Sequence, residues 1–360
     1  MSSPVSAKNQ DALRDPRTLA ELAASIKQWG REAGFAEVGI TGTDLAQDEA
    51  YLLRWLERQF HGDMDYMARH GVKRSRPEQL LPGTIRVISV RMDYAPEEEP
   101  EHGDNTQAFI ARYARGRDYH KLIRKRLQHL ATRLEQEVGM FGYRVFVDSA
   151  PVLEKALARN AGLGWIGKNT LLINSRAGSY FFLGEIYTDL PLPVDEPASE
   201  HCGSCRACLD ICPTKAIVAP YQLDARLCIS YLTIESHQAI PEDLRPHIGN
   251  RIFGCDDCQQ VCPWNKFAQA TDEADFKPRH GFDSADLIEL FLWSEETFLE
   301  RTAGSAIRRL GHERWLRNIA VALGNQAPEP TIEAALEQRR NHPSALVREH
   351  VEWALARLRT

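Results

Sequence analysis

Apolar side chains recur every three or four residues over residues 17–31, and the same period returns over residues 47–59 and 119–138. This spacing predicts amphipathic helices, because positions three and four apart lie on one helix face. Short runs rich in β-branched and aromatic residues predict strands. These runs cover residues 35–40, 85–91 and 143–147. Because helices and strands alternate, the first 195 residues are expected to form an α/β or α+β domain.

The C-terminal part shows helical spacing throughout and contains one pattern twice. Residues 315–325 and 345–355 each carry an arginine, then apolar residues at helical spacing, then Ala-Leu. A repeat of about 30 residues predicts a short HEAT-like helical array. Such arrays bind a partner on one face, and a purely structural cap is the alternative.

Two breaks in the pattern divide the chain. The proline-rich stretch PLPVDEPAS at residues 191–199 interrupts the regular elements, and a polar connector follows Pro263. We therefore predict three domains, at residues 1–195, 196–270 and 271–360.

Composition places the chain among soluble proteins. Of its 360 residues, 43% are hydrophobic and 26% are charged, which is close to the globular average. No segment reaches the roughly 18 uncharged residues of a membrane helix. The N-terminus lacks the apolar core of a signal peptide. We expect a cytoplasmic protein.

Charge is uneven along the chain. The net charge of −6 argues against a uniformly basic nucleic-acid binder. However, residues 104–144 contain nine Lys or Arg against four acidic residues, and residues 301–360 contain ten Arg, no Lys and six Glu. Two solvated helix faces are one interpretation. Arginine without lysine favours planar phosphate or base contacts in the second segment.

All eight cysteines lie between residues 202 and 262. Disulfide frameworks are typical of short exported domains, and a zinc site would need only two CxxC pairs. Both therefore explain the eight cysteines less well than the next alternative. The spacing Cys-x2-Cys-x2-Cys-x3-Cys-Pro from Cys202 is that of bacterial ferredoxins, in which the fourth cysteine binds the other cluster. Residues 255–263 repeat its second half, and Cys228 replaces the missing first ligand. The sequence predicts two [4Fe–4S] clusters, cluster one on Cys202, Cys205, Cys208 and Cys262, and cluster two on Cys212, Cys228, Cys255 and Cys258.

Clusters transfer single electrons, so another part of the chain must hold a redox partner or substrate. Neither a dinucleotide fingerprint nor a phosphate loop is present in the sequence. In VDSAP, at residues 147–151, Asp148 or Ser149 is either a helix cap or, for Asp148, a general acid facing a cleft. The glycines of residues 161–170 form either a plain turn or a close approach to a large, flat ligand.

Together these motifs resemble the epoxyqueuosine reductase family along nearly the whole chain. The resemblance is carried by the cysteine runs, the HEAT-like tail, HGDMDYM at 61–67, RYARGRDYHK at 112–121, DSAPVLEK at 148–155, GLGWIGKN at 162–169 and IFGCDDCQ at 252–259. It implies a base-off cobalamin between the first domain and the cluster domain, near cluster two. It also implies a tRNA substrate with epoxyqueuosine at the wobble position, whose epoxide is reduced by two electrons to an alkene with loss of water.

The fold implied by the resemblance is α+β multidomain, with an α/β cobalamin-binding domain, a ferredoxin-like two-cluster domain and C-terminal HEAT-like repeats that bind tRNA. Asp148 matches the family's proton donor, and an apolar cofactor face is expected to raise its pKa. Residues matching the cobalamin site are Tyr66, Arg69, Tyr113, Asp148, Lys168, Asn169, Ser230, Gly254, Cys255 and Asp256. Candidate phosphate contacts are Arg124, Arg308, Arg309, Arg314, Arg317 and Arg348.

The expected partners are tRNA and a low-potential electron donor such as flavodoxin or ferredoxin, acting on a monomer with no membrane contact. Two other functions stay open at this point. A reductive dehalogenase-like corrinoid enzyme of small molecules would leave the basic tail unexplained. A non-catalytic electron-transfer module would leave the large first domain without a role.

Overall fold

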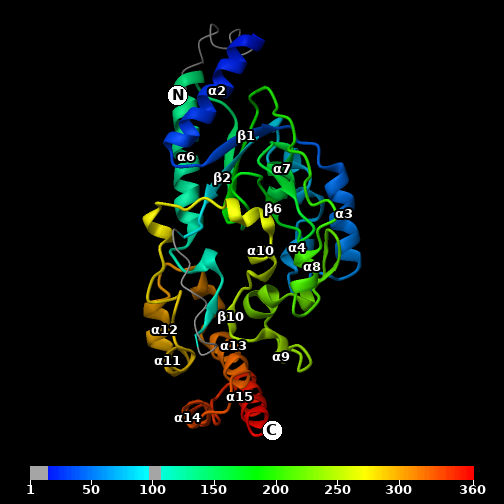
Figure 1. The fold of residues 1–360 in the computed structure, drawn as a ribbon. Helices are drawn as coiled ribbons and strands as arrows, with labels where there is room; N and C mark the ends of the chain where they lie inside the picture. Colours follow the sequence, from blue (N-terminus) through cyan, green and yellow to red (C-terminus); the bar gives the residue numbers. More distant parts are fainter. Residues whose placement is uncertain (1–14, 97–106) are drawn as a thin grey trace.

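The computed structural model describes residues 15–96 and 107–360 (Figure 1). The first 14 residues, for which no signal peptide is expected, lie outside the described residues. The helix predicted over residues 17–31 is confirmed as α2 (Pro16–Glu32). It begins locally, because proline occupies its first turn and an Asp15 carboxylate oxygen accepts a hydrogen bond from the Thr18 N–H at 3.0 Å.

A four-stranded sheet in the order β1-β2-β7-β4 forms the centre of the N-terminal part. Its strands are β1 (Glu37–Thr41), β2 (Arg86–Asp93), β7 (Phe181–Thr188) and β4 (Tyr143–Phe146). The strands expected near residues 35–40, 85–91 and 143–147 are thereby confirmed, whereas β7 was not predicted because Glu185 interrupts its apolar run. Every pairing in this sheet is antiparallel. The α+β class is confirmed, and the α/β description of the first domain is wrong, since α/β units need parallel strands.

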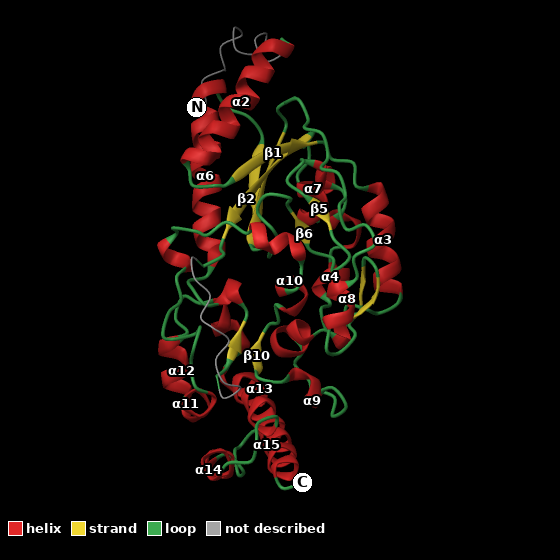
Figure 2. Ribbon diagram, viewed as in Figure 1, coloured by secondary structure: helices red, strands yellow, loops and turns green. Residues whose placement is uncertain are grey.

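Helices cover both faces of this sheet (Figure 2). α2 and α6 (Tyr119–Val138) pack on one face, and α7 (Glu154–Asn160) packs on the other. Side chains alternate along β7, so Phe182 joins the core beneath α6 while Tyr187 joins the core beneath α7. None of the described helices is long and apolar enough to cross a lipid bilayer.

Short elements surround the sheet. The helix expected over residues 47–59 is confirmed as α3 (Ala46–Glu57). The others are α4 (Tyr66–Arg69), α5 (Pro77–Leu80), β5 (Trp165–Ile166) and β6 (Leu172–Ile173). The glycine-rich segment after α7 thus leads into a small antiparallel hairpin of β5 and β6.

The cysteine-rich segment contains two short helices in contact with each other, α8 (Ala207–Ile211) and α10 (Asp257–Gln260). α8 contains Cys208 of the first run, and α10 contains Cys258 of the second. The segment also contains a π-helical turn over Tyr231–Glu235, a geometry often found at functional sites. Its remaining elements are β8 (Ile217–Ala219), β9 (Gln222–Leu223), α9 (Arg245–Ile248) and β10 (Arg251–Phe253).

The C-terminal part is helical, as predicted. The repeated pattern forms α13 (His312–Gly324) and α15 (Ala345–Leu358), which pack directly on each other. Their contact is so close that a Cβ on Gly324 would lie 2.8 Å from the Cα of Ala354. The other helices are α11 (Leu287–Leu292), α12 (Glu295–Arg301) and α14 (Pro330–Gln338). Their grouping as HEAT-like repeats stays a prediction.

The hydrophobic cores do not follow the linear domain order. β3 (Phe109–Ile110) pairs in parallel with β10, and Ala108, Ile110 and Ala114 belong to the core of the C-terminal helices. Val321 of α13 packs in turn against the cysteine-rich segment. The boundaries near residues 195 and 270 stay predictions, but a segment of the first predicted domain is built into the third.

Candidate functional site

Two cavities are each lined by four cysteines. The cluster-one cavity, of about 320 Å³, is lined by the predicted cluster-one set: Cys202, Cys205, Cys208 and Cys262. The Asp148 cavity, of about 390 Å³, is lined by Asp148 and the other set: Cys212, Cys228, Cys255 and Cys258. The fold therefore brings the eight cysteines together in the two groups that the spacing predicts.

The thiols within each set are close electrostatic neighbours. Burial raises the pKa of Cys208, and the thiols of Cys202 and Cys262 raise it further. In the Asp148 cavity burial raises the pKa of Cys258 well above its usual value, and Cys255 and Cys228 add to the effect. Four thiolates in one buried space repel one another, so a cationic centre that binds them all removes this cost. The donor set of each cavity fits a [4Fe–4S] cluster.

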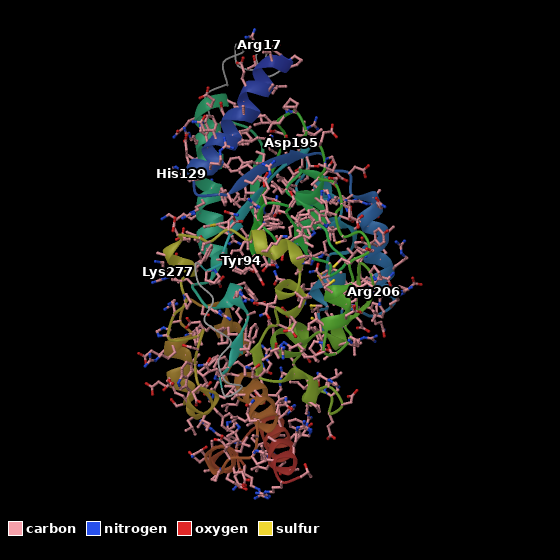
Figure 3. All side chains as sticks on the ribbon, viewed as in Figure 1. Arg17, Tyr94, His129, Asp195, Arg206 and Lys277 are labelled. Atoms are coloured by element: carbon pink, nitrogen blue, oxygen red, sulfur yellow. The ribbon has the colours of Figure 1, made fainter. Side chains whose placement is uncertain are left out.

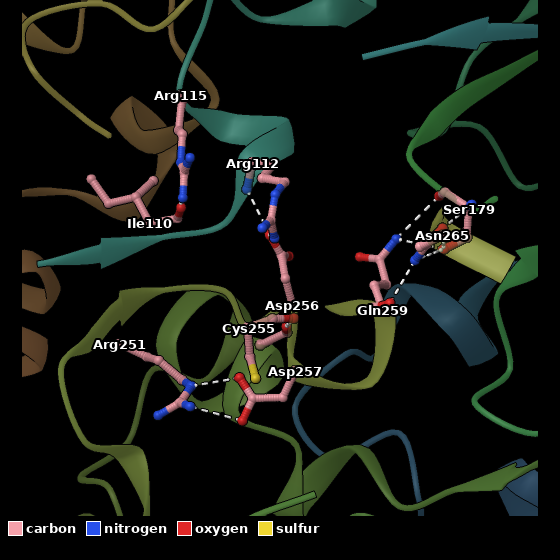
Figure 4. Close-up of polar contacts among 11 residues, drawn as sticks. Ile110, Arg112, Arg115, Ser179, Arg251, Cys255, Asp256, Asp257, Gln259 and Asn265 are labelled. Carbon is pink, nitrogen blue, oxygen red and sulfur yellow. Dashed lines mark hydrogen bonds and ion pairs between the residues drawn. The ribbon is translucent and has the colours of Figure 1, made fainter. Parts of the chain in front are cut away.

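Ion pairs fix the turn that carries Cys255 (Figure 4). Arg251 binds Asp257 with two hydrogen bonds of 2.9 and 2.8 Å. The Arg112 guanidinium contacts a carboxylate oxygen of Asp256 at 3.1 Å, and the Arg112 main-chain N–H donates to the same oxygen at 2.9 Å. Asp256, predicted as a cobalamin contact, therefore lines the cavity with its carboxylate already bound to Arg112.

Asp148 follows the end of β4 in a left-handed backbone conformation, with φ of +34°. The alternative that Asp148 or Ser149 caps a helix is wrong, because α7 begins only at Glu154 and has no side-chain cap. The Asp148 carboxylate instead accepts a hydrogen bond from the Tyr119 hydroxyl and contacts His120 Nε2 at 3.1 Å. His120 Nδ1 in turn lies 2.6 Å from Asp118.

These contacts contradict the expected pKa of Asp148. Burial raises the pKa of Asp148, but the hydrogen bonds from His120 and Tyr119 outweigh it, and the pKa lies below its ordinary value. Burial lowers the pKa of His120, whereas its contacts with Asp118 and Asp148 raise it to about 9. At neutral pH the proton of this pair is therefore held by His120. Sequence reasoning missed His120 and Tyr119, although both lie in the RYARGRDYHK segment.

A second acid, Glu154, lines the Asp148 cavity and was also missed. Burial, and then the negative charge of Asp148, raise its pKa to about 8. The next residue, Lys155, points its ammonium group at the Thr170 carbonyl oxygen, 2.8 Å away. The signal was present in DSAPVLEK, where attention to Asp148 alone left Glu154 unassigned.

The wall of the Asp148 cavity between these polar groups is largely apolar and aromatic. Tyr94, at the centre of the molecule in Figure 3, packs against Phe182 with ring centroids 4.5 Å apart. Tyr119 stacks on the other side of the same region, 3.9 Å from Phe182. An apolar surface with a few convergent polar groups suits a large organic cofactor such as a corrin.

The structure divides the residues predicted to contact cobalamin. Six line the Asp148 cavity: Tyr113, Asp148, Asn169, Ser230, Cys255 and Asp256. Lys168 does not, because its ammonium group donates to the carbonyl oxygens of Gly203 and Cys205 at 2.6 and 2.9 Å, beside cluster one. Arg69 is exposed on α4. Gly254 is not in the cavity wall but provides a close backbone approach, since a Cβ there would lie 2.6 Å from that of Ala111.

Tyr66, also outside the cavity wall, lies near the Asp148 region. It is 42% exposed. Burial and the charges of Glu235 and Asp148 raise its pKa to about 12. The Tyr66 hydroxyl therefore lies within electrostatic reach of the acid at the cavity.

The arginines predicted to contact tRNA differ in their exposure to solvent. Arg124, Arg308 and Arg309 are exposed. Arg314 and Arg348 are half-buried and donate to main-chain carbonyl groups. For Arg317 the prediction is wrong: it is 0% exposed, and its guanidinium donates to the carbonyl oxygens of three residues of the cysteine-rich segment. These three are Leu232, Ser236 and Gln238.

Two family models match the chain. The first, described as "Epoxyqueuosine reductase QueG, DUF1730", matches residues 74–149. The second, described as "4Fe-4S double cluster binding domain", matches residues 201–265. The first match contains Asp148 and the second contains all eight cysteines.

Relatives match nearly the whole chain. The epoxyqueuosine reductase of Pseudomonas aeruginosa is 65% identical over 95% of this chain and 96% of its own. That of Escherichia coli is 57% identical over 96% and 91%. A Bacillus subtilis epoxyqueuosine reductase structure, with its catalytic aspartate loop swung out of the active site, matches with a TM-score of 0.85, 27% identity and coverage of 94% and 90%. An epoxyqueuosine reductase structure with an epoxyqueuosine-modified tRNA stem loop matches with a TM-score of 0.81, 26% identity and coverage of 94% and 99%. This chain belongs to the epoxyqueuosine reductase family.

Proposed function

We propose that this oxidoreductase converts epoxyqueuosine to queuosine at the wobble position of tRNA, in the cytoplasm. The observation that carries the proposal is the Asp148 cavity, in which four cysteines and a proton-transfer group share one space. An epoxide is reduced when electrons reach a carbon and a proton reaches the oxygen, so both must be supplied at one place. High identity to epoxyqueuosine reductases favours this function over the dehalogenase and electron-transfer alternatives.

The cysteines provide the route for electrons. Cys205 is exposed, which makes the cluster-one cavity the point where a flavodoxin- or ferredoxin-like donor would reach the chain. Cys212 and Cys262 each come from one run and line the cavity of the other, so the two sets are interlocked. In the second set, Cys228 and Cys255 would hold the cluster beside the reaction space.

The cavity wall would hold the cobalamin. Bound there, a reduced corrin supplies a strong nucleophile and reductant for the epoxide carbon. Tyr113, Asn169 and Ser230 provide polar groups on a mainly apolar wall, and we propose them as its contacts. Lys168 is proposed instead to support the cluster-one loop.

Asp148 and its partners control the proton. His120 carries a proton at neutral pH and contacts the Asp148 carboxylate, which lies at the cavity with 48% of its side chain exposed. When negative charge develops on the epoxide oxygen, a proton passes from His120 through Asp148 to that oxygen. The Tyr119 hydroxyl and the His120–Asp118 contact hold the carboxylate and the imidazole in position.

The exposed arginines are proposed to bind the anticodon stem loop. Arg124 of α6 is exposed, and Arg309 contacts Asp118 at 2.8 Å, close to the Asp148 pair. Single-stranded loops can present an unstacked base to a pocket while cationic side chains hold the phosphates. We propose that the chain acts as a monomer, with HEAT-like C-terminal helices supporting this contact.

One experiment tests the proposal. The protein is purified anaerobically, incubated with cobalamin, analysed for iron and cobalt, and given a reductant and a tRNA that carries epoxyqueuosine. About eight irons, one cobalt and conversion to queuosine are expected. Full iron without cobalt uptake would contradict the reductase and favour an electron-transfer module, whereas zinc would overturn the cluster assignment.

A further inference from the structure

The proposed reaction consumes two protons, and the inference drawn from this rests on the proposed function. The epoxide gains two electrons and two protons, both of its C–O bonds break, the two carbons become doubly bonded and the oxygen leaves as water. The Asp148–His120 pair holds one transferable proton at neutral pH. Tyr119 is a poor second source, because burial raises its pKa well above the ordinary value. A second acid must supply the other proton in each turnover.

Glu185 is a buried carboxyl group for which packing gives no reason. It is 0% exposed on β7, in register with Ser89 of β2 and Phe146 of β4. Neither of its oxygens has a hydrogen-bond partner among the described residues. Burial raises the pKa of Glu185 well above its ordinary value, so the group is a neutral acid that carries a proton.

Strand pairing relates Glu185 to the chain segment that carries Asp148. Its strand neighbour Phe146 lies two residues before Asp148 on the same chain segment. Glu185 and Tyr187 are two residues apart on β7 and therefore share one face, the face covered by α7. The charges that act on Glu185 are those of Glu154 and Asp148.

Glu154 interacts with both Glu185 and Asp148. It is the first residue of α7 and lines the Asp148 cavity. The Asp148 main-chain N–H donates a hydrogen bond to its carboxyl group. The pKa of Glu154, about 8, keeps it protonated at neutral pH. Lys155, the adjacent cation, is held by the Thr170 carbonyl group instead.

We propose that Glu154 and Glu185 form an internal proton store that supplies the second proton of each turnover to Asp148. Glu154, at the cavity wall, protonates the Asp148 pair again after the first transfer. Glu185 replaces the proton of Glu154 through an intervening water, because neither Glu185 oxygen has a direct hydrogen-bond partner among the described residues. The negative charge left inside the sheet is unfavourable, so it drives uptake of a new proton through the cavity once the product has left.

Tyr187 offers a matched control. Its hydroxyl is buried, has no hydrogen-bond partner among the described residues and lies on the same face of β7 as Glu185. Y187F removes an equally isolated polar atom without removing an acid. Any effect of E185Q that Y187F shares is therefore an effect of packing.

The first test is spectroscopic and does not depend on turnover. Infrared spectra of the anaerobic holoenzyme distinguish the C=O stretch of a protonated carboxyl group from the bands of a carboxylate. At pH 7 we expect one protonated-carboxyl signal that is lost in E185Q and another that is lost in E154Q, with both kept in Y187F. The Glu154 signal should disappear as the pH rises through about 8. Absence of the Glu185 signal from the wild-type spectrum would overturn the store.

The second test is kinetic. In a single turnover with pre-reduced holoenzyme and an epoxyqueuosine stem loop, the wild-type and Y187F rates should be independent of pH below about 8. In E154Q the second proton must come from water, so the single-turnover rate should fall about tenfold for each pH unit between pH 6 and 8. E185Q keeps the proton of Glu154, so its first turnover should match the wild type and only its later turnovers should show this fall. In later turnovers E185D, which keeps an acid, should recover part of the flat profile.

The outcomes separate the two proposals. Wild-type enzyme that is active beside E154Q with the same single-turnover pH profile, or beside E185Q with the same profile over repeated turnovers, overturns the proton store alone. Wild-type enzyme with full iron and cobalt that converts no epoxyqueuosine overturns the proposed function, and the role of the store with it.

Discussion

The two cysteine-lined cavities have similar volumes but different walls. Among the described residues no acidic side chain lines the cluster-one cavity, where Lys168, Lys266 and Trp264 accompany the thiols. The Asp148 cavity has the same number of cysteines and adds four acids, Asp148, Glu154, Asp256 and Asp257, of which Asp256 and Asp257 are paired with Arg112 and Arg251. The cluster-one wall offers thiol ligands for an electron carrier, whereas the Asp148 wall also offers carboxyl groups for proton transfer.

This difference indicates a division of labour. Cationic neighbours such as Lys168 favour the negative charge of thiolate ligands and are sufficient for electron transfer. Reduction of an epoxide also needs proton donors whose pKa values are adjusted by their surroundings, as those of His120 and Glu154 are. Two cavities built from one repeated cysteine motif have thus acquired different chemical capacities through the segments that pack against them.

Removal of one thiol from each cavity should have the largest effects on iron content and turnover, and these effects should differ between the two cavities. C228A should lose about half of the iron and all detectable turnover, because cluster two adjoins the reaction space. C205A should also lose about half of the iron and its turnover with a protein donor, but retain turnover with a strong chemical reductant. Iron analysis with both reductants checks this. Full activity of C228A would remove Cys228 from the ligand set.

Loss of the acid alone should have the next largest effect. D148N keeps the size of the side chain but cannot pass on a proton, so the single-turnover rate should fall roughly 100- to 10,000-fold. Iron and cobalt contents should be unchanged. S149A is the neighbouring control, because the Ser149 hydroxyl donates only to the Val147 carbonyl group, at 3.3 Å. A D148N rate close to that of S149A would contradict the proton role.

The His120 contacts should appear as a pH dependence of stability. The folded pKa of His120, about 9, is above its unfolded value, so its stabilising contribution is complete below about pH 6.5 and is lost as the pH rises through about 9. H120Q should therefore destabilise the protein by on the order of 2 kcal/mol at pH 6 and by little at pH 9.5. Unfolding midpoints of wild type and H120Q at both pH values provide the measurement. An equal loss of stability at both pH values would show that the charge of His120 does not contribute to the stabilisation.

Local patterns predicted the local structure well. The helix expected at residues 119–138 is α6, because Asp118 caps its start and Gly139 ends it. The cysteine grouping was also accessible, since ligand spacing reflects the geometry of the bound cluster. Both results depend on residues that are close in sequence or fixed by a common ligand.

Features made by distant segments were not accessible. The lowered pKa of Asp148 depends on His120, which lies on a different element. The placement of Ala108 and Ile110 in the C-terminal core depends on pairing of β3 with β10. The sequence did contain a sign that Arg317 is buried. Apolar residues lie on every side of α13, and a helix that is apolar on all faces lies inside a protein.

Substitution of the surface arginines should have the smallest effects. R124A and R309A should each weaken binding of an RNA stem loop a few-fold and reduce the slope of log affinity against log salt by about 1. R317M should leave that slope unchanged and instead lower stability by roughly 3 kcal/mol, because carbonyl groups that Arg317 satisfies would lose their donor. Binding titrations at several salt concentrations and unfolding curves separate the two effects. An altered salt slope in folded R317M would return Arg317 to the RNA surface, and unchanged slopes in both surface variants would remove Arg124 and Arg309 from it.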